Sequence, residues 1–485
     1  MDDEVRDADI LKIAAAKGVL IEPDLLREIN SNEERRKQLL AMLEAGESLP
    51  LVIGSEDITL NRGAEAERVG RIMSLPSEIK IVKDVTGNST TTGNVSDFAK
   101  YFTDRFRRLK RIIGKRSDMV GAIPIEKAIQ VDREVRVIGI VNSIRNTRNG
   151  NKVLEIEDED ERCNVYLINE MAKESVLKDE VIGVRGRMSQ ERKAIIASAI
   201  IRPDIAYDRT IEKSDSASEI AFLSDIHVGS KTFLRKEWER LVQWFKTEPQ
   251  AREINYVVIS GDLADGIGVY PNQEDDLELD DVYAQYERVA GYLSQLPDWV
   301  RIMIIPGNHD AVRPAEPQPA FSNDVRKLFD GSALFAGNPS TVDIEGRKLL
   351  AYHGRSFDDV ISDIPHLGWD RPLDAMVELL KRRHLAPVYG EKTPLAAENR
   401  DFMVIEEVPD IFITGHVHSF GLSQYRGVRL ISGSTWQSQT AYQKMRNIFP
   451  IPARMPVLKL SNLSMGVVNF APSQSGRTAG KLRLL

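Results

Sequence analysis

The sequence predicts a mixed α/β architecture, in which a large α/β domain follows a small β-barrel and a short N-terminal helical module. Apolar residues recur at helical spacing over residues 1–46, whereas residues 131–203 alternate in the manner of short antiparallel strands. From residue 219 onward, short apolar strands end one after another in polar residues, as strands do at the functional edge of an α/β sheet. With 485 residues, the chain is long enough for about three such domains.

Composition excludes several classes of protein. Hydrophobic residues make up 42% of the chain and charged residues 28%, which excludes wholesale disorder. The sequence has no apolar run near the ~20 residues of a membrane span, and its acidic start lacks the basic region of a signal peptide, so we expect a cytoplasmic protein without membrane association. The single cysteine, Cys163, excludes an internal disulfide and a cysteine-built zinc site. The net charge of −8 argues against a uniformly basic nucleic-acid binder, so any such contact needs local patches, metal ions or a partner.

Residues 1–46 are expected to form a helical module. Its apolar positions at helical spacing are Ile10, Leu11, Ile13, Leu25, Leu26, Ile29, Leu39, Leu40, Met42 and Leu43. A self-contained bundle and a docking module for a partner both fit this pattern. No periodicity persists over residues 47–78, which we interpret as a linker.

Residues 79–205 are expected to form a barrel domain that carries a basic helix. A polar loop over residues 86–94 precedes the helix, for which Ser96 is the expected N-cap. The helix carries a basic run made of Arg105, Arg107, Arg108, Lys110 and Arg111, followed by Lys115 and Arg116. Such a run can bind phosphates, but a solvated helix face is the commoner role and is our interpretation.

The barrel itself is predicted from five short strands. An Asn149–Gly150 turn joins two alternating segments into a hairpin, and three further segments follow before residue 203. An antiparallel set of this size favours a five-stranded OB-like barrel. OB-folds that bind single strands use aromatic residues on a basic face, whereas this segment offers Tyr166 and an acidic run at 157–161. We therefore expect a structural or subunit-docking barrel.

All seven histidines lie at or beyond His227, and five of them stand at the ends of apolar strands. The polar residues at these five ends are Asp225 with His227, Asp262, Asn308 with His309, His353, and His416 with His418. Because the carboxyl ends of strands in an α/β sheet meet in one crevice, these segments can converge on a single site. Residues i and i+2 of an extended segment point to the same side, which makes Asp225/His227 and His416/His418 natural ligand pairs.

The residue types at these ends indicate metal chemistry. A single strand-end aspartate usually caps a helix and a single buried histidine is usually a core residue, but five histidines at successive strand ends favour a shared site. Oxygen and nitrogen ligands without thiolate suit manganese, iron or zinc better than a pure magnesium or calcium site. Seven ligands exceed the need of one ion and suit two divalent ions that share a bridging carboxylate. His366 and His384 lack this context and are interpreted as structural or as lying on the substrate side.

The ordered motifs D-x-H, GD, GNH[DE], H and GHxH over residues 219–440 resemble those of the calcineurin-like metallophosphoesterase superfamily. The resemblance implies a two-sheet αββα domain, here residues 206–470, with a dinuclear centre at the strand ends. One metal would be held by Asp225, His227 and His418, the other by Asn308, His353 and His416, with Asp262 bridging. Manganese is the metal we expect, with iron, zinc or magnesium as alternatives.

The resemblance also implies roles for two residues that follow Asn308. His309 matches the catalytic histidine, and Asp310 either orients it or caps a turn. Two divalent ions outweigh the two aspartates, so the site attracts a phosphodiester even on an acidic protein. A protonated His309 would then neutralise the charge that develops on the departing oxygen.

The segments between the motifs narrow the substrate. Residues 261–293 and 380–421, and the order of helical module, linker, barrel and phosphoesterase, resemble the small subunit of archaeal family D DNA polymerases. This resemblance, which covers nearly the whole chain beyond the linker, implies a 3′→5′ DNA exonuclease that proofreads primer 3′ ends. It also implies a heterodimer with a large polymerase subunit and a sliding clamp as a further partner.

Two alternatives belong to other classes. The B-subunits of eukaryotic replicative polymerases share this plan as non-catalytic scaffolds, but they have lost ligands that this chain retains. A stand-alone phosphatase or phosphodiesterase would leave the barrel and the helical module without a purpose. Weaker candidates for contacts to substrate phosphate are Arg313, Arg355 and Lys392, although such residues are more often surface charge. The tyrosines at 270, 283, 286 and 292 could cover the site or form a subunit interface, but core packing is the commoner role, and the same alternatives apply to Trp436. Residues 471–485 are expected to be a flexible tail.

Overall fold

The computed structural model describes residues 78–189, 194–211, 214–329, 331, 333–445, 447–472 and 482–484, with scattered positions between residues 10 and 53. The chain divides into two compact units, Met1–Leu75 and Pro76–Leu485. In the described part of the chain, no helix is both long and apolar enough to cross a membrane.

The first unit contains a small apolar core. Its described buried residues are Ile10, Ala14, Leu25, Leu39 and Leu43, all at helical positions. Strand β1 (Leu20–Ile21) pairs in parallel with β2 (Val52–Ile53). Because β2 falls inside the segment expected to be a linker, ordered structure continues further than the apolar periodicity indicated. Residues 54–77 of that linker lie outside the described residues.

Two sheets form the centre of the second unit. The larger sheet has seven strands in the order β12 (Ala333–Phe335), β11 (Arg301–Ile305), β10 (Ile254–Ser260), β9 (Glu219–Leu223), β18 (Arg454–Lys459), β19 (Met465–Asn469) and β20 (Leu482–Leu484). The smaller sheet has six, in the order β16 (Phe420–Tyr425), β17 (Val428–Gly433), β15 (Ile411–Thr414), β14 (Arg347–Ala351), β13 (Ser340–Ile344) and β3 (Lys80–Lys83). Strands β9 to β12 are mutually parallel, and so are β14, β15 and β17.

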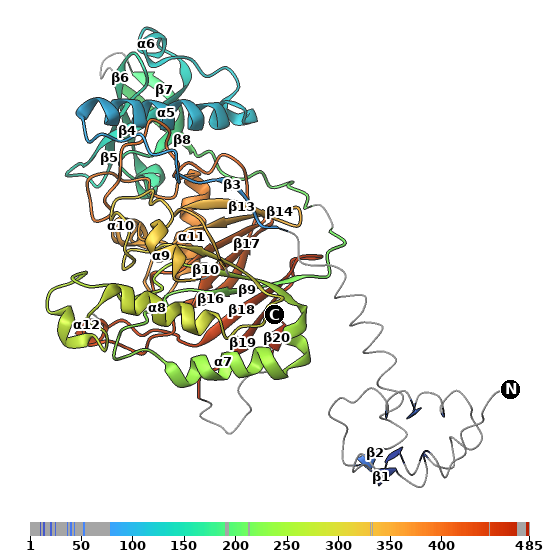
Figure 1. The fold of residues 1–485 in the computed structure, drawn as a ribbon. Coiled ribbons are helices and arrows are strands. Elements are labelled where there is room, and N and C mark those ends of the chain that lie inside the picture. Colours follow the sequence, from blue (N-terminus) through green and yellow to red (C-terminus); the bar gives the residue numbers. More distant parts are fainter. Residues whose placement is uncertain are drawn as a thin grey trace. The chain divides into compact units, whose positions relative to one another are not determined.

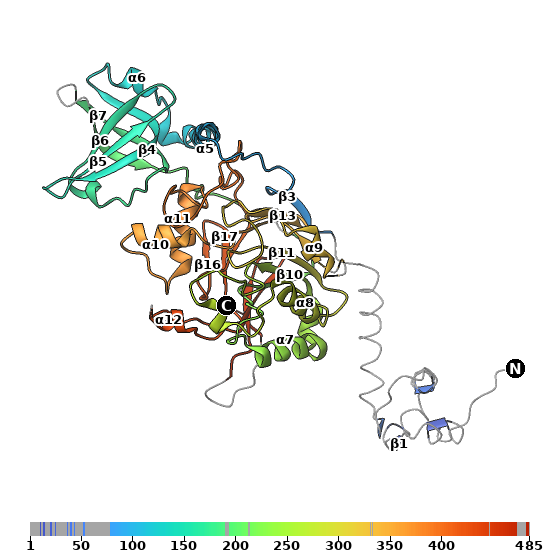
Figure 2. The same ribbon diagram turned by 60° about the vertical axis from the view of Figure 1, so that its left-hand side comes forward.

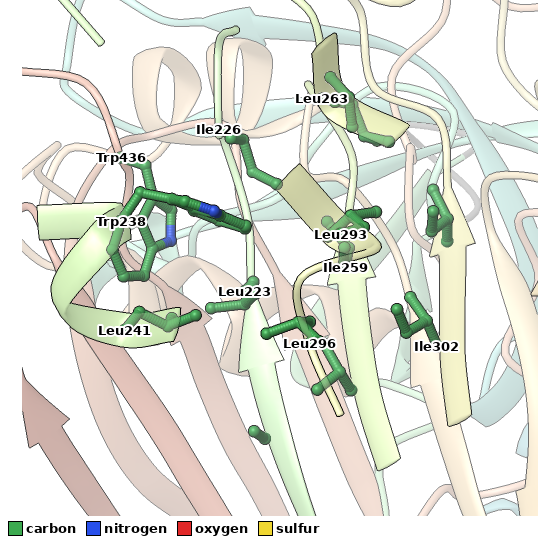
Figure 3. Close-up of a cluster of buried hydrophobic side chains, with 14 of the residues drawn as sticks. Leu223, Ile226, Trp238, Leu241, Ile259, Leu263, Leu293, Leu296, Ile302 and Trp436 are labelled. Carbon is green, nitrogen blue, oxygen red and sulfur yellow. The ribbon is translucent and has the colours of Figure 1, made fainter. Parts of the chain in front are cut away.

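Helices cover the outer faces of both sheets, which confirms the predicted αββα layers (Figure 1). The facing sides of the sheets bury one apolar cluster, to which β9, β10 and β11 contribute from one sheet and β13, β14 and β15 from the other. Helices α7 (Arg235–Thr247) and α8 (Val282–Leu293) pack on the seven-stranded sheet, where Trp238 and Leu293 meet Leu223 and Ile259 (Figure 3). Helices α10 (Phe357–Asp363) and α11 (Pro372–Arg382) cover the six-stranded sheet. Two short helices, α9 (Asn323–Lys327) and α12 (Ala441–Met445), lie in connections.

The predicted barrel is present as a closed sheet with the order β4 (Glu134–Asn146), β5 (Lys152–Glu157), β6 (Arg162–Leu167), β8 (Ala194–Ile201) and β7 (Val181–Ser189) (Figure 2). It is not wholly antiparallel as expected, because β6 and β8 pair in parallel. Gly150 has a φ of 74° in the turn between β4 and β5, a conformation that favours glycine. The short helix α6 (Ile125–Ala128) closes on the apolar interior, which includes Val137, Leu154 and Val184.

The basic helix joins the barrel to the phosphoesterase layers. The N-cap of helix α5 (Val95–Gly114) is Asn94 rather than the expected Ser96. The backbone N–H of Asn94 donates to the Asp97 carboxylate at 3.4 Å, as in a capping box. Arg105 and Arg108 are buried, so they belong neither to a solvated helix face nor to an exposed phosphate-binding run, the two roles considered from the sequence. Arg107 and Lys110 do face solvent, where both pair with Glu159.

Two segments lie elsewhere than their sequence positions indicated. Strand β3 belongs to the six-stranded sheet, where it pairs with β13, although residues 79–205 were expected to form the barrel domain. Strand β20 lies in the segment expected to be a C-terminal tail, and it pairs with β19. Residues 473–481 of that segment lie outside the described residues. Both short strands add to existing sheet edges, and an edge of that kind is not visible in a local pattern.

Candidate metal centre

All seven candidate ligands follow parallel strands of the two sheets and meet at one edge. Asp225 and His227 follow β9, Asp262 follows β10, Asn308 follows β11, His353 follows β14, and His416 and His418 follow β15. The carboxyl ends of the two parallel sets therefore supply the whole group, as the α/β rule predicts. Asp225, His227, Asp262 and His353 are no more than 1% exposed, and His418 is 8% exposed.

Distances place these side chains within reach of common ions. Asp262 Oδ2 lies 3.2 Å from His353 Nε2 and 3.7 Å from His227 Nε2, so its carboxylate stands between the two sides of the site. On one side, His227 Nε2 lies 3.0 Å from His418 Nε2, which is 3.5 Å from Asp225 Oδ1. On the other, His353 Nε2 lies 3.0 Å from Asn308 Oδ1. Two of the triads that could hold an ion are Asp225 with His227 and His418, and Asp225 with Asp262 and His353.

The backbone is strained at five of these residues. Asp225, His227, Asp262, His416 and His418 have φ values between 51° and 69°, in the left-handed region that side chains with a Cβ rarely adopt. Close glycines allow the loops to meet, because a Cβ on Gly307 would overlap the Asp262 carboxylate and a Cβ on Gly415 would overlap Ser224. Such strain is concentrated where function requires a fixed arrangement.

A second polar contact orients each imidazole of the candidate ligands. His227 Nδ1 donates to Asp265 Oδ1 at 2.9 Å, and His353 Nδ1 donates to the Ser260 carbonyl at 2.8 Å. His416 Nε2 lies 3.1 Å from Asp358 Oδ1, and His418 Nδ1 lies 2.9 Å from Gln443 Nε2. Outer partners of this kind hold the rings of metal-binding histidines and leave the other nitrogen for the ion.

The charge of the cluster also fits divalent cations. Despite burial, Asp265 and Asp262 raise the pKa of His227 to about 9. Burial likewise opposes protonation of His353, yet Asp262 raises its pKa to about 10. Burial raises the pKa of the Asp225 carboxyl. Buried carboxylates are stable in their charged form only beside positive charge. Cations held by these nitrogen and oxygen donors would supply that charge.

His309 lies beside this group and has one ring nitrogen committed. Its Nδ1 donates to the Asp265 carbonyl at 2.7 Å, its backbone amide donates to Asp262 Oδ1 at 2.8 Å, and its ring centroid is 4.7 Å from that of His227. Burial lowers the pKa of His309. Of the two roles considered for Asp310, the structure shows the capping one, because its carboxylate accepts from the backbone amides of Gly307, Leu263 and Ala264 and from Tyr286 Oη.

The residues that orient the candidate ligands were not predicted from the sequence. They are Ser260, Asp265, Gln273, Asp358, Gln437 and Gln443. Asp265 is the most connected, since it accepts from Gln273 and Gln437 as well as from His227. Its place in the GDLAD segment, three residues after Asp262, was the one available signal. Gln273 and Gln443 lie on short helical segments and Gln437 follows β17, and only tertiary structure brings the three glutamines here.

Most of the weaker candidates have structural roles. Arg313 pairs with the buried Glu398 at 2.7 Å, and Lys392 donates to the Asp358 carbonyl and to Ser362. Arg355 is half-buried, two residues after His353. Trp436 packs against Trp238 in the core.

The tyrosines divide between core and site. Tyr286 Oη bonds Asp310, and Tyr292 packs on Trp238. Tyr283 is 49% exposed on α8, and Tyr270 lies beside His309. Of the two remaining histidines, His384 is structural, since it is buried against Asp401, and His366 is exposed.

Two layered sheets with these ligands at their shared edge define a calcineurin-like phosphoesterase, and residues 218–420 match the model of the family described as calcineurin-like phosphoesterase. The chain is 45% identical over 411 residues to the DNA polymerase II small subunit of Archaeoglobus fulgidus, covering 83% of each chain. It is 37% identical over 475 residues to that of Methanothermobacter thermautotrophicus, covering 93% of this chain and 97% of that protein. The chain therefore belongs to the family of archaeal DNA polymerase II small subunits, and the polymerase resemblance inferred from its motifs is confirmed.

Proposed function

We propose that this chain is a two-metal 3′→5′ DNA exonuclease that proofreads primer 3′ ends as the small subunit of a heterodimeric DNA polymerase. The observation that carries the proposal is the complete site. All seven predicted ligands and His309 are gathered at one strand edge in a family of polymerase subunits. A non-catalytic scaffold would not need four imidazoles each oriented by a second hydrogen bond.

The roles of the ligands follow from the two sides of the site. Asp225, His227 and His418 would hold one ion, Asn308, His353 and His416 the other, and the carboxylate of Asp262 would bridge the two ions. His416 Nε2 is committed to Asp358, which leaves its Nδ1 as the donor. Two divalent ions, manganese by preference, would supply Lewis acidity toward the phosphodiester and lower the pKa of a bound water.

His309 is placed to act on the leaving group. Hydrolysis of the last phosphodiester releases a nucleotide, and the departing atom is the 3′ oxygen of the preceding sugar. With Nδ1 held by the Asp265 carbonyl, Nε2 is the ring nitrogen that can donate a proton to that oxygen. The proton of the attacking water leaves to solvent, so the exchange balances.

A large polymerase subunit, the primer 3′ end and a sliding clamp are the partners that fit this function in the cytoplasm. Helix α5 supports a role for the barrel in subunit docking. Its buried Arg105 bonds both to the Asp179 carbonyl beside β7 and to Asp401 of the phosphoesterase. The barrel and the adjoining phosphoesterase face are therefore held as one surface, and we place the subunit interface there.

The test compares wild type, His309→Ala and His366→Ala on a 5′-labelled primer with a 3′ mismatch. Manganese is added with and without chelator, and the large subunit is present in a parallel series. Wild type and His366→Ala should shorten the primer from its 3′ end, and chelator should stop both. His309→Ala should be slower by about 100-fold or more, because it lacks the acid.

Two outcomes would count against the proposal. Equal digestion by His309→Ala and wild type would remove His309 from the chemistry or reveal a contaminant. No digestion by wild type, even with the large subunit, would favour the scaffold class.

A further inference from the structure

An aromatic pair lies next to the catalytic histidine. The ring centroid of Tyr270 is 6.4 Å from that of His309 and 6.5 Å from that of Tyr442, and the two tyrosine rings are inclined by only 28°. Tyr442 is 48% exposed on α12. Two nearly parallel rings, one of them open to solvent, thus extend outward from the reacting centre.

Both rings are tied to residues that hold the site. Tyr270 Oη donates to Asp276 at 3.1 Å, and its loop is anchored by Gln273, whose side chain donates to Asp265. Tyr442 precedes Gln443, whose side chain meets His418 Nδ1 at 2.9 Å. The pair is therefore fixed relative to both His309 and His418.

Exposed apolar side chains follow Tyr442 along the chain, among polar residues such as Lys444 and Asn447. Met445 is 79% exposed and Phe449 69% exposed, and Ile451 connects this segment to the site through a 2.9 Å hydrogen bond from its amide to the His418 carbonyl. An exposed aromatic ring beside a polar site, as Tyr442 is, suits a ligand with a flat apolar face. Nucleobases have such a face and stack on aromatic side chains regardless of sequence.

We propose that Tyr270 and Tyr442 form a subsite that stacks the nucleobase of the nucleotide being removed. The proposal deepens the proposed function and rests on it for the identity of the polymer. The contact with His309 favours a base over a protein partner, because an occupant here must share the site with the reacting phosphate. A base stacked on Tyr442 must leave its neighbour in the duplex, so the subsite selects frayed, mismatched or single-stranded ends over paired ones.

Binding measurements test the subsite without turnover. Titration calorimetry with the full chain and manganese would compare dAMP with 2-deoxyribose 5-phosphate, which lacks the base. Wild type should bind dAMP about 10-fold more tightly than the sugar phosphate, since stacking on one aromatic residue is worth about that factor. Tyr442→Ala should bind both alike, and Tyr442→Trp should retain the preference.

The matched control is Tyr207→Ala. Tyr207 is 86% exposed and packs on Arg426 in the turn between β16 and β17, at the end of these strands away from His418. This variant should bind dAMP as wild type does.

Exonuclease assays should rank the variants as the binding measurements do. Tyr442→Ala should raise KM about 10-fold on single-stranded DNA and leave kcat nearly unchanged. A terminal abasic nucleotide should raise the wild-type KM equally and add nothing in Tyr442→Ala.

The failures of the two proposals are distinguishable. If Tyr442→Ala keeps the preference for dAMP, or if wild type has none, the subsite is overturned whatever the exonuclease assay shows. If wild type prefers dAMP through Tyr442 but digests no DNA, the subsite stands and the exonuclease proposal fails.

Discussion

Arg105 and Asp401 form an ion pair of 2.8 Å in which both side chains are fully buried, and this pair joins helix α5 to the phosphoesterase layers. The guanidinium also donates to Pro387 O at 2.8 Å and to Tyr101 Oη at 3.0 Å. Burial opposes ionisation of Asp401, but His384 and Arg105 hold the pKa of that carboxyl well below its usual value. A charged network thus lies where helix α5 meets the phosphoesterase layers.

Asp401→Asn should therefore destabilise the protein strongly. Removing one partner leaves the other charge buried and unpaired, and the free energy of unfolding should fall by about 3–5 kcal/mol. Glu159→Gln is the control, because it breaks an exposed pair with Arg107 on the same helix and should cost about 0.5 kcal/mol or less. Urea denaturation measures both, and equal losses would show that the buried pair contributes no more than a surface pair.

His384 should make stability depend on pH. Burial and the neighbouring Arg105 lower its pKa from 6.5 to about 4, and the neutral ring accepts from the Ala386 amide while donating to Asp401. In the unfolded chain His384 takes up a proton near pH 6.5, whereas in the folded chain it does so only near pH 4. The contribution of neutral His384 to the free energy of unfolding is therefore complete above pH 6.5 and is lost as the pH falls toward 4.

The measurement is the difference in free energy of unfolding between wild type and His384→Gln, taken from pH 7 to pH 4. The advantage of wild type should shrink by about 3 kcal/mol over this range. Parallel stability curves for the two proteins would contradict a neutral buried His384.

Asp265→Asn should weaken metal binding although Asp265 is not expected to be a ligand. The substitution removes the negative charge that holds His227 Nδ1, and loss of such an outer partner typically lowers metal affinity about 10- to 100-fold. Manganese titration of the full chain measures it. Asp280→Asn changes an exposed acidic residue and should bind manganese as wild type does. If Asp265→Asn also keeps the wild-type affinity for manganese, the Asp265 carboxylate has no role in metal binding.

Gly307→Ala should displace Asp262 from the centre of the site. The new Cβ would overlap the Asp262 carboxylate and approach its backbone nitrogen, and neither can move without disturbing the strand ends. We expect manganese affinity to fall at least 10-fold, by the same reasoning as for a lost oriented ligand. Gly291→Ala is the control, since a Cβ there meets nothing within 4 Å, and it should leave metal binding unchanged.

The layers and the barrel were predictable because they rest on local patterns. Strands β9, β10, β11, β14 and β15 are short apolar runs, and the five barrel strands alternate around a glycine turn. The convergence of His227, His353 and His418 followed from one topological rule about the ends of parallel strands. Whether these side chains hold manganese, and whether His309 donates a proton, stay predictions.

Helix α5 shows what local sequence patterns do not predict. Its basic run was interpreted as a solvated face or a phosphate site, yet Arg105 and Arg108 are buried and Arg107 and Lys110 are exposed. Helical spacing tells which residues share a face, but not whether that face meets solvent or another domain. The partner, Asp401, lies 296 residues further along the chain.

By itself the sequence determined the main element types and placed the seven candidate ligands at strand ends, because side-chain periodicity and strand-end position are local properties. Only the tertiary structure decided which side chains orient those residues, since Asp265 lies in a loop, Asp358 on α10 and Gln443 on α12, and these segments meet only in space. It also decided that Tyr442 lies beside Tyr270. Hydrogen bonds and ring contacts act over about 3–7 Å between residues that lie far apart in sequence, and only the packed chain fixes those distances.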